Sequence, residues 1–328
     1  MHRRTFVGFA AGGLIVSSIG VGGQPAPQVR RIGWLWNRAP VPAANFYEYT
    51  KDLRARGWIE GKNLVVEQRY TSGNENLLPA LAEELVRLKV DLIVADGTVA
   101  ALAAQKATST IPVVFSRAAD PVRVGLVASL AHPGRNITGT STMEPDFDQK
   151  RIQILHELLP AARRVGLLVV STNPAEGWRR ETYEAFAPSL GLQPIFVEVT
   201  KAADLESAVA EAARRGAHVL HISPEPLLAS KENFLRILRA AQQHSLPIIF
   251  DNRRWLEEGA LVSCGPDNDE LQFQLAFLID NVLRGARPSD LPVIQPRNID
   301  LGINLRAAKS LGITVPRSLL VRANVVVQ

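Results

Sequence analysis

The stretch LPALAEELVRLKVDLIVADGTVAALAAQKATSTIPVVF, residues 78–115, decides the fold class. Apolar residues recur at helical spacing over 78–89 and 99–108, whereas LIVA (92–95) and VVF (113–115) are short continuous apolar runs. Strands that alternate with helices in this way are typical of a parallel sheet, because each parallel connection has to cross back over the sheet through a helix. The stretch therefore predicts an α/β fold.

The same alternation continues on both sides of this stretch and forms two series. Apolar runs of the first series lie at 32–36, 64–70, 92–95, 113–115 and 137–139, and those of the second at 165–170, 194–199, 218–222, 247–250 and 260–263. The polar segment TSTMEPD (140–146) interrupts the alternation between them. Two such series predict two doubly wound parallel-sheet lobes with a ligand cleft between them, since ligands bind at the carboxyl ends of parallel strands.

Beyond the second series the chain has a helical pattern at 270–283 and a final strand and helix, IDLGINLRAAKSLG (299–312). A tail after two complete lobes has to return to one of them. We therefore expect crossings near 264 and 296 besides the seam, which gives three hinge crossovers. The predicted first lobe is 30–140 plus about 265–296, and the second is 141–264 plus about 297–328.

Composition and charge exclude several classes of protein. The 328 residues correspond to about two domains, and the net charge of +5 is spread without a block of five like charges. We therefore expect neither a nucleic-acid partner nor a membrane-binding patch. The single cysteine, Cys264, excludes an internal disulfide and a CxxC site. Because GxGxxG after a strand, GxSxG and HExxH are also absent, we predict no catalytic residue, cofactor or metal site.

Residues 1–29 have the pattern of an export signal. They contain no acidic residue, begin with Arg3 and Arg4, and continue with eighteen uncharged residues from Phe6 to Gly23. The order Arg3-Arg4-x-Phe6 predicts twin-arginine export, with an ordinary secretory signal as the alternative. No cysteine comes directly after the apolar stretch, so we expect a cleaved signal, no lipid anchor and a periplasmic protein.

Polar residues follow the predicted strands of both series. They are Asn37, Gly97, Thr98, Ser116, Arg117, Asn173, Ser223, Glu225 and Asp251. Each alone is also explained as a helix cap, a role that Ser, Thr, Asn and Asp commonly fill. Their repetition in both series favours ligand-binding residues that face one another across the cleft.

Some of these candidates have a specific chemistry. Gly97 lets a ligand approach the backbone, and Thr98 begins a helix whose free N–H groups attract a carboxylate. Arg117 offers a guanidinium to an anion, and Asp120 is explained equally well as a helix cap or as the partner of a cationic group. We also assign Trp36, directly before Asn37, to the cleft, although core packing is the ordinary role of a strand tryptophan.

The segments GWIEGKNLVVEQRY (57–70), 78–139, LPIIFDNRRWLEEGALVSCGPD (246–267) and INLRAAKSLGITVPRSLLVRA (303–323) resemble the ABC-transporter substrate-binding proteins related to the streptococcal tryptophan and tyrosine binders. This resemblance implies a type I periplasmic-binding-protein fold that captures a small molecule. It also implies two partners, a permease and, through it, a cytoplasmic ATPase. Gly97, Thr98 and Asp120 match loop positions that face the cleft in this family, and Asn173 matches their counterpart in the second lobe.

Three residues depart from the family pattern: Cys264 replaces an aromatic residue, Arg135 replaces a turn glycine, and Arg117 stands where the residue is often small. The ligand that the resemblance implies is an aromatic amino acid, with another amino acid or small organic acid as the alternative. The protein is expected to be a monomer that meets the membrane only through the permease. Two other functions compete. One is an enzyme on the same architecture, for which catalytic motifs are missing, and the other is a ligand sensor, for which no DNA-binding or signalling pattern is present.

Overall fold

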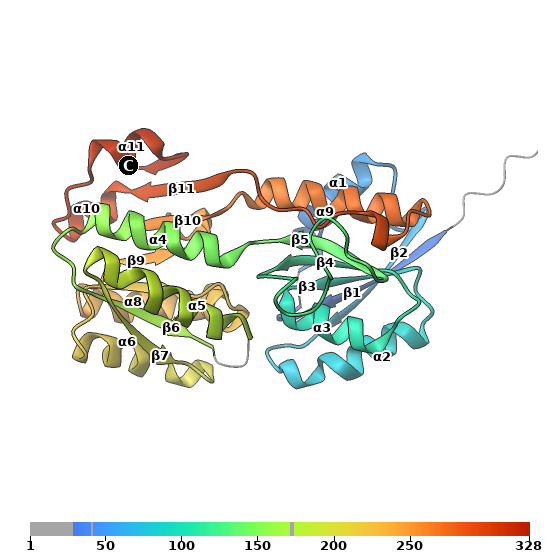
Figure 1. Ribbon diagram of the computed structural model, residues 1–328, viewed down its shortest axis with the longest axis horizontal. Helices are drawn as coiled ribbons and strands as arrows, with labels where there is room; N and C mark the ends of the chain where they lie inside the picture. Colours follow the sequence, from blue (N-terminus) through green and yellow to red (C-terminus); the bar gives the residue numbers. More distant parts are fainter. Residues whose placement is uncertain (1–28, 41, 171–173) are drawn as a thin grey trace, which may run out of the picture.

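The computed structural model describes residues 29–40, 42–170 and 174–328, which form two α/β lobes (Figure 1). The first lobe holds a five-stranded parallel sheet of order β2-β1-β3-β4-β5. Its strands are β1 (Arg30–Trp36), β2 (Leu64–Tyr70), β3 (Leu92–Asp96), β4 (Val113–Ala118) and β5 (Ile137–Ser141). All five include the apolar runs from which they were predicted.

Helices cover both faces of this sheet. On one face lie α2 (Leu78–Arg87) and α3 (Thr98–Ala107), and on the other α1 (Ala43–Ala55) and α9 (Asn268–Leu283). The buried side chains of α2 are Leu78, Ala82 and Leu85, whose spacing places them on one side of a helix. The first lobe is therefore a three-layer unit whose last helix comes from far along the chain.

The second lobe holds a seven-stranded sheet of order β12-β11-β10-β9-β8-β6-β7. Its strands are β6 (Arg164–Val169), β7 (Gln193–Glu198), β8 (Val219–Ile222), β9 (Ile248–Phe250), β10 (Val262–Pro266), β11 (Ile299–Asn304) and β12 (Val325–Val327). One face packs against α6 (Leu205–Arg214) and α8 (Lys231–Gln243), with the short α7 (Pro226–Ala229) beside α8. The other packs against α4 (Glu144–Leu158), α5 (Pro174–Phe186), α10 (Leu305–Ser310) and α11 (Arg317–Arg322).

The expectation of purely parallel sheets is wrong at one strand of the second lobe. β11 pairs antiparallel with β10, with Val262 opposite Ile303 and Pro266 opposite Ile299. The reason is the path of the chain: β11 starts at the end of the sheet where β10 finishes, because the chain returns there from the first lobe. β12 then pairs parallel with β11.

The chain passes between the lobes three times. It leaves the first sheet between β5 and α4, returns between β10 and α9, and crosses again before β11 (Figure 1). The segment before the last crossing stays beside β5, where the amide of Ser141 donates to the carbonyl oxygen of Ile294 at 2.9 Å. Within the described residues, none of the helices has the length and apolar character that crossing a bilayer requires.

Two glycines lie on strands that lead into these crossings. A Cβ on Gly139 of β5 would stand 2.1 Å from the carbonyl oxygen of Phe115, and one on Gly265 of β10 would stand 2.0 Å from that of Asp251. Neither distance leaves room for a side chain. Glycine thus lets each crossing strand lie directly against the backbone of its neighbour.

Candidate ligand site at the facing edges of the lobes

The carboxyl ends of β3 and β4 point toward the second lobe, and that of β6 points toward the first (Figure 1). β8 and β9 run parallel to β6 in the same sheet, so their carboxyl ends face the first lobe as well. We call these two ends the facing edges. Loops and helix N-termini gather at such ends in parallel sheets. The facing edges are therefore the place to look for the predicted site residues.

On the first facing edge, Gly97 and Thr98 hold the step from β3 into α3. Gly97 has φ +86°, which favours glycine, and its amide donates to the carbonyl oxygen of Ser116 at 2.8 Å. The Thr98 hydroxyl accepts from the amide of Ala119 at 3.0 Å and therefore ties α3 to the end of β4. A Cβ on Gly97 would meet nothing within 4 Å, so the backbone is open on that side.

Two other predicted residues of the first lobe have structural partners. Asn37 donates to Glu75 at 2.6 Å and accepts from the hydroxyl of Thr71 at 3.2 Å, which orders the loop after β2. Asp120 accepts from the amide of Arg123 at 3.0 Å, in the manner of a helix cap. Roles of these two residues toward a ligand stay predictions.

The placement of Trp36 on the cleft surface is wrong in this structure. Its ring is 0% exposed and stacks on Trp34 at 5.0 Å between centroids, within the core under α1 and α9. The Arg38 guanidinium lies 4.9 Å from the Trp36 ring centroid and donates to Asp96 at 2.7 Å and to Tyr49 at 2.8 Å. Arg38, which the sequence analysis missed, thus covers the tryptophan at this edge.

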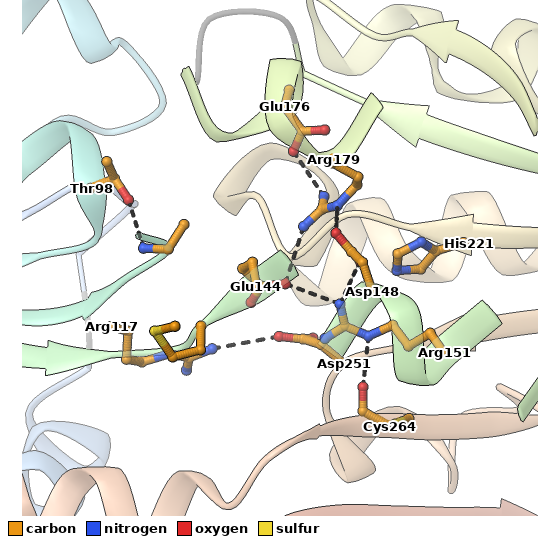
Figure 2. A network of polar contacts seen from close by, with 12 residues as sticks. Thr98, Arg117, Glu144, Asp148, Arg151, Glu176, Arg179, His221, Asp251 and Cys264 are labelled. Carbon is orange, nitrogen blue, oxygen red and sulfur yellow. Dashed lines mark hydrogen bonds and ion pairs between the residues drawn. The ribbon is translucent and has the colours of Figure 1, made fainter. Parts of the chain in front are cut away.

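Arg117 connects the two lobes. It lies in a bulge between β4 and β5 with φ +59°, unusual for a residue other than glycine, and its amide donates to the hydroxyl of Thr140 at 3.0 Å. Its guanidinium reaches across to the carboxylate of Asp251, after β9, with 3.6 Å between Nη2 and Oδ2 (Figure 2). Two predicted residues from opposite lobes are therefore brought together.

The second facing edge holds a buried set of charges that we call the ion network. Its members come from α4 and α5 and are Glu144, Asp148, Arg151, Glu176 and Arg179 (Figure 2). Arg151 Nη1 donates to Asp148 at 2.8 Å and to Glu144 at 3.0 Å. Arg179 donates to Glu176 at 2.9 Å, to Asp148 at 3.1 Å and to Glu144 at 3.2 Å. All five side chains are at most 9% exposed.

Burial raises the pKa values of the network's carboxylates, whereas their arginine partners lower them. Burial raises the pKa of Glu176 to about 6, against the opposing charge of Arg179. Burial also raises the pKa of Asp148 and of Asp251, whereas Arg151 and Arg179 overcome it at Glu144 and hold that pKa below its ordinary value. The three carboxylates of the network therefore depend on the two arginines to hold their negative charge.

The other predicted residues of the second lobe fall as follows. Ser223 is 1% exposed at the end of β8, and Glu225 is 7% exposed just before α7. Asn173 lies outside the described residues, as does almost all of the predicted export signal. Sequence reasoning missed the ion network because its residues lie on helices, and no helical pattern had been assigned to 144–158 or 174–186.

A second contact crosses between the lobes at the surface. The Arg123 guanidinium pairs with Glu181 of α5, and its carbon lies 4.8 Å from the ring centroid of Trp178. Both ionic partners are exposed, Arg123 by 42% and Glu181 by 63%. The lobes thus meet through Arg117–Asp251, whose carboxylate is buried, and through exposed ion pairs such as Arg123–Glu181 and Arg253–Asp269.

A cavity of about 300 Å³ lies elsewhere, in the second lobe. Residues of α8, β9 and α10 line it, among them Leu238, Ile248 and Ala307. Among the predicted site residues that the structure describes, none borders it. It does not belong to the candidate site.

Comparisons with known proteins agree with this architecture. The chain is 26% identical over 265 residues to the tyrosine-binding protein of Clostridioides difficile, covering 80% of this chain and 75% of that protein. A domain protein from Vibrio cholerae has a TM-score of 0.84 at 28% identity, covering 91% of this chain and all of that one. An ABC domain from Streptococcus pneumoniae in complex with L-Trp has a TM-score of 0.83 at 25% identity, covering 92% and 100%.

The fold is that of the type I periplasmic binding proteins. The family model described as ABC transporter substrate binding protein matches residues 47–327, which is most of the chain. The chain therefore belongs to the ABC transporter substrate-binding protein family.

Proposed function

We propose that this protein is the extracytoplasmic solute-binding component of an ABC importer and captures an amino acid or a related small organic acid between its lobes. The observation that carries the proposal is the meeting of charged residues from opposite lobes at the facing edges, Arg117 with Asp251. Family membership supports the solute-binding role. The relatives named for tyrosine and L-Trp make an aromatic amino acid the first candidate ligand.

Capture requires motion between two bodies. We propose residues 30–140 with about 265–296 as one body and 141–264 with about 297–328 as the other, joined by the three crossings. Hinge bending at these crossings would open and close the facing edges. The Arg117–Asp251 and Arg123–Glu181 pairs, which both join the lobes, belong to the closed arrangement.

The proposed partners are a permease, which receives the solute, and a cytoplasmic ATPase behind it. Residues 1–29 would act as a cleaved export signal that places the monomeric protein in the periplasm without a lipid anchor. The protein itself would carry out no chemistry. In support, burial raises the pKa of the Cys264 thiol to about 11, so the thiol is protonated at neutral pH and is a poor nucleophile.

Mass spectrometry of compounds released from the denatured protein, followed by calorimetry with L-tyrosine and L-tryptophan, tests the proposal. We expect a released solute, and we expect binding that raises the melting temperature and lowers the radius of gyration. Thr98→Ala is expected to weaken binding about ten- to hundredfold, because a hydrogen bond to a charged group is worth about 1.5–3 kcal/mol. Turnover of the solute would favour an enzyme, and a saturated protein of unchanged radius would contradict closure.

A further inference from the structure

We propose that the Arg117–Asp251 ion pair holds the place of a zwitterionic ligand, which enters by exchanging partners: its carboxylate pairs with Arg117 and its ammonium group with Asp251. The inference rests on the proposed function and narrows the ligand to molecules that carry both charges. α-Amino acids are the simplest members of that class.

The geometry of the pair shows that both groups can accept a new partner. At 3.6 Å the contact is an ion pair and is too long for a hydrogen bond. Within the described residues, no side-chain hydrogen bond of the Arg117 guanidinium is present, so its donors are open to a carboxylate. The Arg117 side chain is 34% exposed, which leaves it room to turn.

Asp251 depends on a cation from the other lobe. Its carboxylate is 3% exposed, and the charged groups that act on it are Arg117, Arg151, Glu144 and Arg254. Arg151 donates through Nη1 to Glu144 and Asp148 and through Nε to the carbonyl oxygen of Cys264, whereas its Nη2 has no hydrogen-bond partner within the described residues. Arg254 directs one nitrogen to the carbonyl oxygen of Ala229 and stacks over Trp255 at 4.4 Å. Separation of the lobes would therefore remove the one cation that the first lobe supplies.

The position of Arg117 also suits a carboxylate. The carbonyl oxygen of its neighbour Ser116 accepts from the amide of Gly97, so the backbone that carries the Arg117 side chain lies beside the N-terminus of α3. A carboxylate on Arg117 would lie near the positive end of that helix, and the open side of Gly97 leaves space there. Figure 2 shows Thr98 and Arg117 on the same side, opposite Glu144 and Asp251.

Charge balance makes the exchange selective. Closure without ligand satisfies both groups through each other, and closure on a zwitterion satisfies both through the ligand. A ligand with the carboxylate alone leaves Asp251 without its cation, and a ligand with the ammonium alone leaves Arg117 without its anion. Each partial ligand is expected to bind roughly 10- to 100-fold more weakly than the zwitterion.

The test uses three matched compounds on the full mature protein: L-tyrosine, its deaminated form 3-(4-hydroxyphenyl)propanoate, and its decarboxylated form tyramine. If L-tryptophan is the tighter ligand, its two corresponding analogues replace them. We expect the amino acid to bind tightest. Arg117→Met should lower the ratio of the affinity for L-tyrosine to that for tyramine by at least tenfold. Asp251→Asn should lower the ratio of the affinity for L-tyrosine to that for the deaminated acid by at least tenfold.

Arg123→Met is the matched control, since it removes an exposed ion pair between the lobes and is expected to leave both preferences within about twofold. Unchanged preferences in Arg117→Met and Asp251→Asn, with the amino acid still bound, would overturn the exchange and leave the solute-binding function standing. Release of a natural ligand with only one charge would also overturn the exchange and leave the solute-binding function standing. If no solute is released and none binds, both the exchange and the solute-binding function are overturned.

Discussion

The two facing edges belong to lobes of the same α/β plan, yet they hold their charges differently. On the first lobe, Arg38 and Asp96 form a pair that is 31% and 13% exposed, above an aromatic core. On the second lobe, the ion network places two arginines and three carboxylates where water is nearly excluded. Charges with access to water can rearrange at small cost, whereas buried charges are costly to leave unpaired.

This difference assigns the two edges different tasks. The first edge presents a helix N-terminus and side chains that can exchange one ionic partner for another, such as Arg117. The second presents carboxylates fixed by two arginines, each of which bonds to several partners. In a binding site of this kind, the side chains of one edge can change partners while those of the other edge keep their positions. Closure on a ligand then requires rearrangement on one side only.

The largest effect is expected from removing the centre of the ion network. Arg151→Met leaves Glu144 and Asp148 buried with Arg179 as their remaining cation, and should lower the free energy of unfolding by about 3–5 kcal/mol. Arg38→Met, its counterpart on the first edge, should cost about 1 kcal/mol. Denaturant unfolding of both variants measures the contrast. Equal losses would show that the two edges do not differ in this way.

A second expectation compares the two glycines behind the interlobe ion pair. Gly139→Ala and Gly265→Ala each force a backbone carbonyl away, and each should lower the free energy of unfolding by about 1–3 kcal/mol. Gly265→Ala should also weaken ligand binding more strongly, because it displaces Asp251 itself, whereas Gly139 contacts Phe115, two residues before Arg117. Calorimetry separates the two. A larger loss of affinity in Gly139→Ala would mean that the preorganised side of the site belongs to the first lobe and not to the second.

The smallest effect concerns pH. An acid with a raised pKa in the folded state binds its proton more readily when folded, so its contribution to the free energy of unfolding falls as pH rises. For Glu176 this decrease spans pH 4.5 to about 6. In Glu176→Gln, the decrease in the free energy of unfolding across this pH range should be smaller by up to about 2 kcal/mol. Unfolding curves across this window check the expectation, and an identical decrease in the variant would mean that Glu176 does not carry it.

Much of the fold could be predicted from the sequence because each strand that is buried on both faces forms an apolar run. The runs at 32–36 and 92–95, for example, lie within β1 and β3. The direction of β11 could not be predicted, because it depends on where the chain re-enters the second lobe. The start of α4 reads as polar linker, since Glu144 and Asp148 are charged and yet buried.

For the candidate site, strand ends identified Arg117 and Asp251, which do meet across the lobes. The same rule also selected Asn37, whose side chain bonds to the loop after β2. Asp120, chosen as a helix cap or the partner of a cationic group, accepts from the amide of Arg123 in its own loop. A strand end shows where a polar group lies and does not show what it contacts. Arg151 and Arg179 have no such marker, because pairing partners on two helices become neighbours only in the folded chain.

The late position of α9 in the sequence affects how the protein can be made. Leu275, Leu278 and Ile279 of α9 bury Ile32, Trp34 and the rest of that face of the first sheet, yet they follow ten of the twelve strands in synthesis. Until they leave the ribosome, α1 alone covers the tryptophan face, so the first lobe cannot complete its core before most of the second has been made. Transport of the chain before this moment would deliver both lobes unfinished, whereas transport after it would deliver a protein that is already assembled.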